Sequence, residues 1–475
     1  MKENPVNQTH PAFSAGSAPQ TFQSPYSVTF WGAARCVTGS MHVVQLGDFR
    51  ILLDCGVHTG NDRPTVTPKL PFNAAKLDAV ILSHNHTDHV GRIHELFVEG
   101  YAGPIHCTRP ARDLMEVQLL NSARIQEQEF ASRNTVTLQG TAHRLSTKLA
   151  RKVVDHCIPL DYDQPVEILP GIGLTLYDAG HILGSAMVVL SFRQGIHDRR
   201  LAFTGDIGRS GLPYLKPAQT LPPCDYAICE STYGGRKHES REQMGKKLGK
   251  IVTDTIERGG KILMPAFSLG RTQAVLHHLR RWMNEGVVPT IPIHVDSPLG
   301  RVFSQVYKDY PEALAVPEPK SPEVDWMVDP EEAYQASKSH GSSVIIASGG
   351  MLEGGKILKH LRNHVDDPRS TLCLVSFQAP GTLGSKVLEK HPTLTFHGRT
   401  WNKWIDVQEI SGFSGHGDHD DLCRAMEPML ERNGCVRLVH GEPDGMKALS
   451  GSLKAMGLEV GMPDMGEVWN LEAKD

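Results

Sequence analysis

The segment of residues 84–89, His-Asn-His-Thr-Asp-His, places four potential metal ligands within six residues. An apolar run ends just before it, so these ligands are expected on the loop that leaves the C-terminal end of a buried strand. His84 and His86 are two residues apart and face the same way while the chain is extended, so both can bind one ion. Asp88 and His89 then fall in the turn into the next helix, where they can bind a second ion.

The ligand types in this segment indicate the metal and the kind of reaction. Imidazole and carboxylate groups without a thiolate favour zinc in an open, catalytic site over a closed structural site, which usually recruits cysteine. A histidine-rich surface loop is the alternative, but four ligands at this spacing argue against it. The segment therefore predicts a hydrolytic metal centre.

Further ligands are expected at the ends of other strands, because a dinuclear site needs more groups than one loop supplies. Three candidates each follow a strand-like apolar run: His181, Asp206 and His440. The carboxylate of Asp206 can bridge two ions. Asp54 closes another apolar run, and we expect it to accept a hydrogen bond from a ligand histidine and fix its tautomer. Each residue alone would be an ordinary buried polar side chain, but all share one context of apolar strand, ligand and glycine.

In order along the chain, these residues resemble the motifs of a known family. The first set resembles the four leading motifs of the metallo-β-lactamase fold: Asp54, residues 84–89, His181 and Asp206. The second set resembles motifs A, B and C of the β-CASP nuclease branch of that fold: Glu230, His416 and His440. The likeness covers roughly residues 26–472. It is closest to the bacterial and archaeal ribonucleases related to the nuclease subunit of the eukaryotic cleavage and polyadenylation machinery.

The ligands and the resemblance together imply a mechanism with two zinc ions. One ion is expected on His84, His86 and His181. The other is expected on Asp88, His89 and His440, with Asp206 bridging the two. The metals would lower the pKa of a shared water, so that hydroxide attacks phosphorus near neutral pH.

The resemblance gives the proton of the leaving 3′-oxygen to His416, kept charged by Glu230, and it implies 5′-phosphate and 3′-hydroxyl products. We therefore count Asp54, Asp88, Glu230 and His416 as the catalytic residues, with single-stranded RNA as the partner.

The order of strand-like and helical segments predicts an α/β protein in which one domain is inserted into another. Up to Glu230 the pattern and the resemblance indicate a four-layer αββα metallo-β-lactamase fold. The alternating strands and helices that follow predict a parallel, doubly wound inserted α/β domain, the β-CASP domain. The predicted divisions are a disordered tail at 1–25, the first part of the αββα domain at 26–236, the insertion at 237–396 and the second part at 397–475.

Within the insertion, Ser240 and Gln243 predict a capping box at the start of an amphipathic helix that ends at the glycine pair 259–260. A second helix is expected near 271–284, with His277, His278, Arg280 and Arg281 on a solvated face. Two glycine-rich turns between strands and helices, which contain Arg271 and Ser348, are suited to bind phosphate on their backbone amides. By resemblance, Ser414 and Gly415 are further substrate contacts.

Composition sets broad limits on partners and location. The net charge of −4 gives no global basic field that would indicate nucleic acid, so positive potential must be local. Nine scattered cysteines without a CxxC pair indicate reduced thiols and a cytoplasmic protein. No stretch approaches the roughly 20 apolar residues of a membrane-spanning helix. The sequence leaves open a homodimer, the RNA target, and whether cleavage is internal or proceeds from the 5′ end.

Other functions share parts of the pattern. A thioester or β-lactam hydrolase of the same fold would not need the insertion or the pair of Glu230 and His416. A DNA nuclease of the β-CASP branch is expected to carry an apolar residue where this chain has His440. A non-catalytic scaffold would have lost metal ligands, and a di-iron oxidoreductase would favour a carboxylate in place of His86. The sequence therefore favours a ribonuclease.

Overall fold

The computed structural model describes residues 24–59, 68–133, 144–378, 381–389 and 391–472. Except for its last two residues, the predicted tail at 1–25 lies outside this part of the chain.

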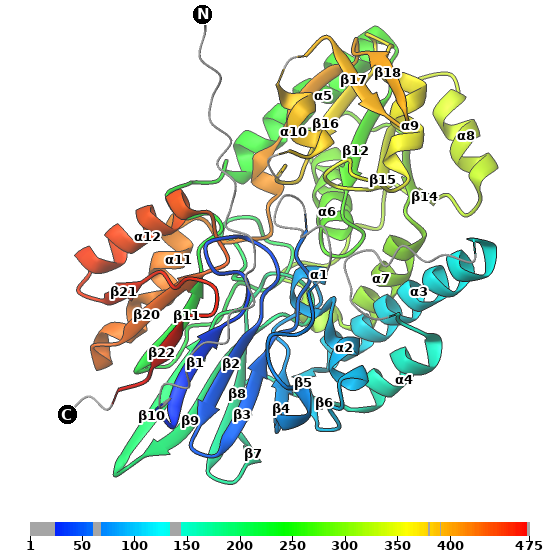
Figure 1. The fold of residues 1–475 in the computed structure, drawn as a ribbon. Coiled ribbons are helices and arrows are strands. Elements are labelled where there is room, and N and C mark those ends of the chain that lie inside the picture. The colour runs from blue at the N-terminus through cyan, green and yellow to red at the C-terminus, as the bar shows by residue number, and fades with distance from the viewer. Residues whose placement is uncertain (1–23, 60–67, 134–143, 379–380, 390, 473–475) are drawn as a thin grey trace, which may run out of the picture.

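Two seven-stranded sheets form the lower half of the molecule (Figure 1). The first contains, in spatial order, β22 (Val468–Asn470), β1 (Tyr26–Phe30), β2 (His42–Leu46), β3 (Phe49–Leu53), β4 (Ala79–Ile81), β5 (Ile105–Thr108) and β6 (Cys157–Leu160). The second contains β21 (Glu459–Gly461), β20 (Cys435–Val439), β11 (Tyr226–Glu230), β10 (His197–Phe203), β9 (Ala186–Gln194), β8 (Ile172–Asp178) and β7 (Val166–Leu169).

The two sheets pack face to face, and side-chain alternation along the strands decides which residues meet. In β3, Ile51 and Leu53 join the core between the sheets, whereas Leu52 joins a second core on the outer face. The helices over that outer face are α2 (Ile93–Val98), α3 (Arg109–Arg133) and α4 (Thr147–Asp155). The outer face of the second sheet is covered by α11 (His419–Met426) and α12 (Pro443–Ala455). The predicted four-layer αββα arrangement is confirmed.

Parallel pairing brings the carboxyl ends of the central strands to common edges. In the first sheet β3, β4 and β5 pair in parallel, and in the second sheet β10, β11 and β20 do so. β8 has the same direction as β10, because both are antiparallel to β9. The loops after β3 and β4 therefore start at one edge of the first sheet, and those after β8, β10, β11 and β20 start at one edge of the second.

A third sheet of six parallel strands lies above the first two (Figure 1). Its order is β14 (Val324–Trp326), β13 (Ile293–Asp296), β15 (Val344–Ser348), β12 (Ile262–Ala266), β16 (Thr371–Leu374) and β19 (Asp406–Glu409). One face packs on α5 (Arg241–Arg258) and α6 (Arg271–Asn284). The other packs on α8 (Pro330–Lys338), α9 (Ile357–His364) and α10 (Leu383–Leu388). Helices on both faces of a parallel sheet confirm the predicted doubly wound insertion.

The third sheet extends past residue 396, where the sequence placed the end of the insertion. β19 pairs in parallel with β16, so the sheet itself ends at residue 409. A two-stranded sheet of β17 (Thr393–Phe396) and β18 (Arg399–Asn402) spans the predicted boundary. These strands are four residues long and partly exposed, so their hydrophobic pattern is too weak to place a boundary. As domain limits, 26–236, 237–396 and 397–475 stay predictions.

Helix α5 has the termini that the sequence predicts. Ser240 Oγ accepts a hydrogen bond from Gln243 N, and Gln243 Oε1 accepts one from Ser240 N, so the capping box is complete. Gly259 ends the helix in the left-handed conformation with φ 70°, which glycine adopts without a steric penalty. The buried face contains Met244, Leu248, Ile251, Val252 and Thr255.

Helix α6 also has its predicted bounds, but the expected solvated face is wrong. His277 and His278 are buried, and their rings lie 4.7 Å from the Tyr214 ring and 5.6 Å from the Trp282 ring, respectively. Both histidines therefore belong to the packing between the insertion and the loop that contains Tyr214. Arg281 stays at the surface beside Glu285.

The contribution of the capping box to the stability of α5 can be tested by substitution of Ser240. Ser240→Ala is expected to destabilise the first turn of α5 by about 1 kcal/mol, because the amide of Gln243 loses its acceptor. The measurement is hydrogen–deuterium exchange in α5 together with the thermal midpoint of the protein.

Ser240→Asp is the matched control, since its carboxylate can accept the same hydrogen bond. Equal exchange in both variants and in the parent protein would contradict the role of the cap.

Candidate metal centre and active site

The predicted ligands and the supporting residue Asp54 lie on loops that follow five different strands, at the edges where those strands end. Two of them adopt left-handed backbone: Asp54 has φ 58° and His440 has φ 51°. This conformation costs roughly 1 kcal/mol in a residue with a side chain, so it persists only where the surroundings enforce it. Hydrogen bonds do so here, from Asp54 N to Ile81 O at 3.0 Å and from His440 N to Ala33 O at 2.7 Å.

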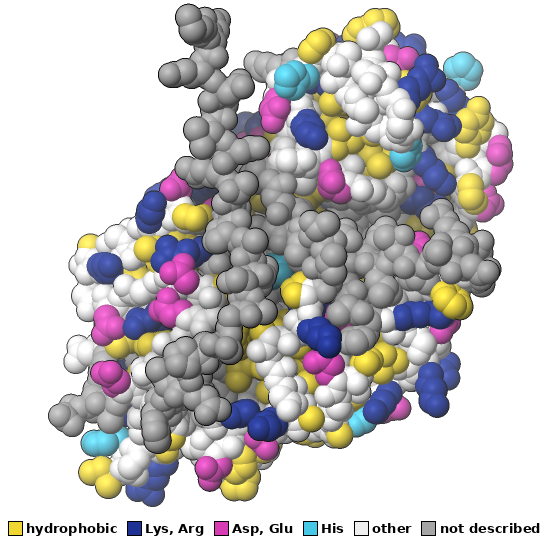
Figure 2. Space-filling model, in the orientation of Figure 1, with side chains coloured by type: hydrophobic (Ala, Val, Ile, Leu, Met, Phe, Trp, Pro, Cys, Tyr) yellow, Lys and Arg dark blue, Asp and Glu magenta, His cyan; other side chains and the backbone are white. Residues whose placement is uncertain are grey.

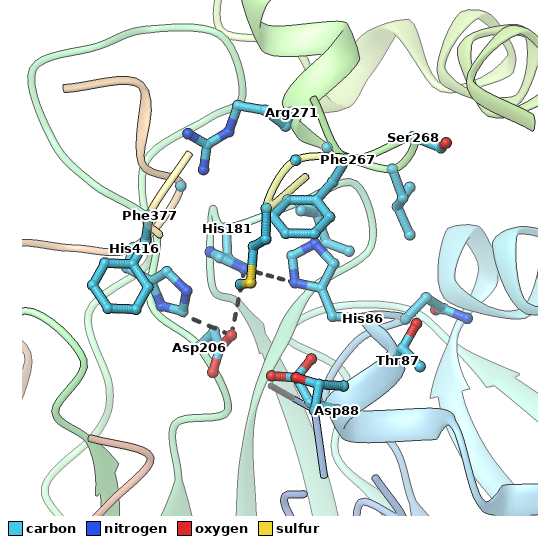
Figure 3. A pocket seen from close by; sticks show the side chains of 18 of the residues that line it. His86, Thr87, Asp88, His181, Asp206, Phe267, Ser268, Arg271, Phe377 and His416 are labelled. Carbon is cyan, nitrogen blue, oxygen red and sulfur yellow. Dashed lines mark hydrogen bonds and ion pairs between the residues drawn. The ribbon is translucent and has the colours of Figure 1, made fainter. Parts of the chain in front are cut away.

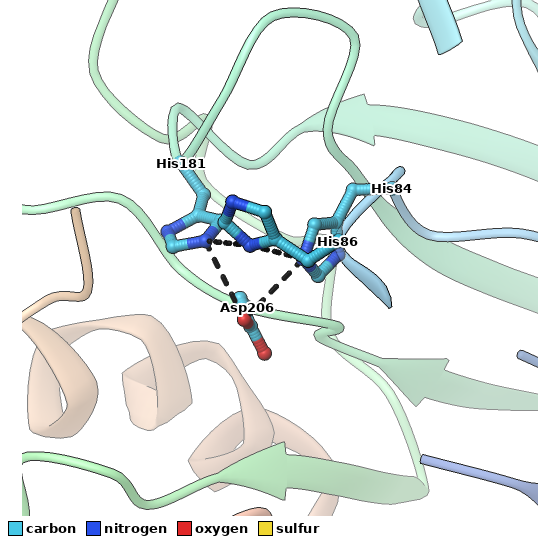
Figure 4. Close-up of side chains that lie close together, drawn as sticks. All are labelled: His84, His86, His181 and Asp206. Atoms are coloured by element: carbon cyan, nitrogen blue, oxygen red, sulfur yellow. Dashed lines mark hydrogen bonds and ion pairs between the residues drawn. The ribbon is translucent and has the colours of Figure 1, made fainter. Parts of the chain in front are cut away.

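The first group of ligands contains His84, His86, His181 and Asp206, which come together from three loops (Figure 4). His84 Nε2 and His181 Nε2 lie 3.1 and 3.2 Å from His86 Nδ1. Burial lowers the pKa of all three histidines, to about 3 for His86, so the rings are neutral. Neutral imidazole nitrogens that converge on one point are suited to hold a metal ion.

The second group contains Asp88, His89 and His440. His89 Nε2 lies 3.0 Å from His440 Nε2, which in turn lies 3.5 Å from Asp88 Oδ2. The short helix α1 (Thr87–Val90) begins directly after His86 and contains Asp88 and His89. Although burial alone would raise it, the hydrogen bond to His440 and the charge of His89 hold the pKa of Asp88 below its usual value.

Asp206 lies between the two groups and divides its carboxylate between them. Its Oδ2 atom lies 3.4 Å from His84 Nε2 and 3.4 Å from His181 Nε2. Its Oδ1 atom lies 3.3 Å from His89 Nε2 and 3.5 Å from His440 Nε2. Oδ1 is buried and accepts no hydrogen bond from the described residues. A buried carboxylate oxygen is costly unless a positive charge compensates it, so the donor set fits metal ions.

Asp54 supports the second group from behind, as the sequence predicts. The Nδ1 atom of His89 lies 2.7 Å from Asp54 Oδ2. Ser83 donates to Asp54 from its backbone and its hydroxyl, both at 2.8 Å, and Ser40 donates at 3.3 Å. Burial alone would lower the pKa of His89, but the carboxylates of Asp206 and Asp54 raise it well above its usual value. A metal ion at Nε2 would replace the second proton of that ring.

Thr232 plays the corresponding part for His440 and was given no role from the sequence. Its Oγ1 atom lies 2.9 Å from His440 Nδ1, which leaves Nε2 to face the second group. Thr232 follows Glu230 by two residues, and β11 and β20 are paired strands. Only that pairing shows that the two loops meet, because 208 residues separate Thr232 from His440.

Glu230 and His416 form a pair beside Asp206. His416 Nδ1 lies 3.2 Å from both carboxylate oxygens of Glu230 and 3.8 Å from Asp206 Oδ2. Glu230 is held by the backbone amides of Ile207 at 2.7 Å and Thr232 at 3.3 Å. Burial alone would lower the pKa of His416, but the neighbouring carboxylates raise it to about 9. His416 is therefore a cation near neutral pH, as the sequence expects, and it can give up a proton.

A cavity of about 970 Å³ opens above both groups, between the αββα domain and the insertion (Figure 3). His86, Asp88 and Asp206 line its floor, and His416 lines one side. The insertion contributes residues 267–271, which lead into α6, and residues 349–351, which follow β15. A substrate in this cavity would touch both domains at once.

Three of the four predicted substrate contacts line the cavity: Arg271, Ser414 and Gly415. The guanidinium of Arg271 donates to Val375 O and points into the cavity in Figure 3. Ser348 is not among the lining residues of the described chain. Its hydroxyl accepts a hydrogen bond from Lys356 N at 3.2 Å, and the two glycines after it line the cavity instead.

Arg209 and His238 also lie at this site, although the sequence assigned neither of them a role. Arg209 lines the cavity and donates to Gly412 O and, at 3.0 Å, to Glu239 O. His238 Nε2 lies 2.9 Å from His416 O. Both residues hold the loop that delivers His416, and no local sequence signal marks them because their partners are backbone groups distant in the chain.

The distribution of charged side chains on the surface agrees with the expectation that positive potential is local. On the face shown in Figure 2, Lys and Arg side chains are scattered among Asp and Glu side chains and do not form a single stripe. None of the helices in the described chain is both long enough and apolar enough to cross a bilayer.

Three family models match separate parts of the chain. Residues 43–195 match a metallo-β-lactamase superfamily domain, and residues 272–387 match a β-CASP domain. Residues 405–463, which contain His416 and His440, match a zinc-dependent metallo-hydrolase RNA specificity domain.

Whole-length comparisons agree with these matches. The chain is 34% identical to a ribonuclease from Thermus thermophilus over 92% of its own length and 98% of that protein. It is 35% identical to a transcription termination factor, FttA, from Methanocaldococcus jannaschii, over 87% of its length and 67% of that protein. A protein of unknown function from Enterococcus faecalis has the same fold, with a TM-score of 0.55 over 94% of this chain, all of that chain and 14% identity. With these relatives and the three domains in order, the chain belongs to the β-CASP branch of the metallo-β-lactamase superfamily.

Proposed function

We propose that the protein is a zinc-dependent ribonuclease that hydrolyses phosphodiester bonds of single-stranded RNA and leaves 5′-phosphate and 3′-hydroxyl ends. The observation that carries this proposal is the pair of Glu230 and His416, which places a protonated imidazole 3.8 Å from Asp206 in a cavity between two domains. A match to an RNA specificity domain over residues 405–463 and a relative named as a ribonuclease support it.

The proposal includes two zinc ions. His84, His86 and His181 would hold one, Asp88, His89 and His440 would hold the other, and Asp206 would bridge them. Bound there, the metals would supply a water that deprotonates near neutral pH and positive charge for the phosphate oxygens. Asp54 keeps His89 oriented, and Thr232 does the same for His440.

His416 acts as the general acid in this proposal. Glu230 occupies its Nδ1 atom, and no described residue hydrogen-bonds its Nε2 atom. Nε2 is therefore the atom that would donate a proton to the leaving 3′-oxygen. A carboxylate that holds the ring charged and oriented before substrate arrives is what a general acid needs.

The proposed phosphate contacts are Arg271, Ser414 and Gly415. Burial lowers the pKa of Arg271 to about 10, which still leaves a cation at neutral pH. Arg271 also begins α6, whose first backbone amides carry positive partial charge. Ser348 is left out, because its hydroxyl is used within its own turn.

We further propose a cytoplasmic location, since all nine cysteines are free thiols. Sedimentation of the purified protein tests whether it forms the homodimer that the sequence leaves open.

The ligand groups predict the metal content. The protein is expected to bind about two zinc ions per chain, and Asp88→Ala is expected to lose part of that content because Asp88 belongs to one group only. Metal analysis after zinc reconstitution measures both.

Asp444→Ala, which removes a fully exposed carboxylate near His440, should keep the full content. One ion or none in the parent protein would contradict the dinuclear proposal.

His416→Ala is expected to keep its metals and lose roughly 10²- to 10⁴-fold in the rate of RNA cleavage, because it lacks the general acid. In Glu230→Gln the pKa of His416 should fall, so the loss of activity on the alkaline side should move to lower pH. Single-turnover cleavage across a pH series measures both effects.

His391→Ala removes an exposed histidine and is the control. Loss of zinc in His416→Ala would show that His416 is a ligand.

Unpaired RNA is expected to be cleaved faster than duplex RNA, since unpairing costs about 1.4 kcal/mol per base-pair step on the DNA stacking scale. It should also be cleaved faster than single-stranded DNA, because the 2′-hydroxyl allows a protein to distinguish RNA from DNA. End-labelled oligonucleotides of one sequence, with analysis of the product ends, provide the measurement.

DNA cleavage at an equal or higher rate would indicate a DNA nuclease. Turnover of a thioester or β-lactam with RNA left intact would indicate a small-molecule hydrolase.

A further inference from the structure

Two phenylalanine rings of the insertion line the cavity without a part in the metal groups. Phe267 follows β12 and Phe377 lies three residues after β16, which is the neighbouring strand of the third sheet. Both side chains are partly solvent-exposed, and 40% of the surface of Phe267 is accessible. Part of each ring faces the cavity, where a planar ligand can cover it and remove apolar surface from water.

The Phe267 ring is held in place from behind. Its backbone carbonyl accepts hydrogen bonds from Thr272 N at 3.0 Å and Thr272 Oγ1 at 2.8 Å, which fixes the start of its side chain. A Cβ added at Gly350 would lie 3.0 to 3.2 Å from three atoms of the ring. The ring therefore rests against the backbone of Gly350, and the remaining ring surface faces the cavity.

The two rings lie near different residues of the site. The turn that contains Phe267 reaches His86, because a Cβ added at Gly270 would lie 3.7 Å from His86 Nε2. Figure 3 shows Phe267 on the side of His86 and Phe377 on the side of His416, with the guanidinium of Arg271 above and between them. A phosphate held between Arg271 and the metal groups would therefore have one ring on each side.

The described chain offers neither ring an aromatic partner. Other aromatic side chains around the cavity, such as Tyr214 and Tyr307, stack on one another at 5.9 Å between ring centroids. Phe267 and Phe377 take part in no such contact within the described residues. Their exposed surfaces are thus available to a planar ligand that enters the cavity.

We propose that Phe267 and Phe377 are stacking platforms for the two nucleobases that flank the scissile phosphate. This inference rests on the proposed function, since it assigns the bases of the same RNA substrate. Every base has a π-face, so stacking of this kind accepts any sequence. It also requires bases that are not paired in a duplex. The two rings of the insertion would therefore explain the preference for unpaired RNA.

The test uses the zinc-loaded protein and a set of unstructured oligoribonucleotides with one abasic nucleotide at successive positions. The parent protein is expected to cleave RNA with a lower kcat/KM, by roughly 5- to 100-fold, when the abasic site lies next to the cleaved bond on either side. Phe267→Leu should lose a similar factor on intact RNA and lose the abasic penalty on one side only. Phe377→Leu should do the same on the other side.

Matched variants separate stacking from a general loss of structure. Phe267→Tyr keeps a stacking ring and should retain activity, whereas Gly350→Ala should displace the Phe267 ring and behave like Phe267→Leu. Phe130→Leu makes the same substitution at an exposed phenylalanine of α3 that does not line the cavity, and it should have no effect.

The outcomes distinguish this inference from the proposal on which it rests. Abasic penalties that persist unchanged in both leucine variants, with RNA still cleaved, would overturn the stacking platforms alone. Failure of the parent protein to cleave any RNA would overturn the proposed ribonuclease function and the stacking platforms with it.

Discussion

The buried carboxylate of Asp206 is the constraint around which the site is organised. It is 2% exposed, and four histidine nitrogens from three loops lie within 3.5 Å of its two oxygens. An uncompensated charge in such a place would cost several kcal/mol, so positive charge near this carboxylate stabilises the fold. One of its oxygens faces each ligand group, so the carboxylate lies between the two halves of the site. Hydrogen bonds hold the left-handed backbone of Asp54 and His440, which brings Asp54 to His89 and His440 to this carboxylate.

The second requirement is that loops from distant parts of the chain meet in a defined geometry. Parallel pairing of β10, β11 and β20 sets Asp206, Glu230 and His440 on neighbouring loops, although more than 200 residues separate Glu230 from His440. The inserted domain lies between β11 and β20 in the chain. Its sheet therefore lies above the ligands, and the loops after β12, β15 and β16 form the opposite wall of the cavity. An insertion at this point converts an open metal site into a cleft with two walls.

Recognition of substrate in this molecule depends on local features, because the whole surface carries no dominant charge. The net charge is −4, and basic and acidic side chains are mixed on the visible face. Positive potential at the cavity comes from Arg209, Arg271 and the protonated ring of His416, together with whatever metals are bound. Partly exposed aromatic surface at the rim adds an uncharged means of holding a nucleic acid. Both features act at short range, so they favour a nucleic acid that is bound in the cavity over one that is distant from it.

The sequence by itself predicted the fold class, several elements and the candidate ligands that the structure brings together, because these depend on local spacing. The string at residues 84–89, the capping box of α5 and the bounds of α6 are all encoded within a few turns of chain. Tertiary structure decided the rest. Thr232 on His440, Arg209 on Gly412 and Phe267 on Gly350 each join residues that no local pattern connects. The burial of His277 and His278 and the extension of the third sheet to residue 409 are likewise set by packing partners far along the chain, which a periodic pattern cannot identify.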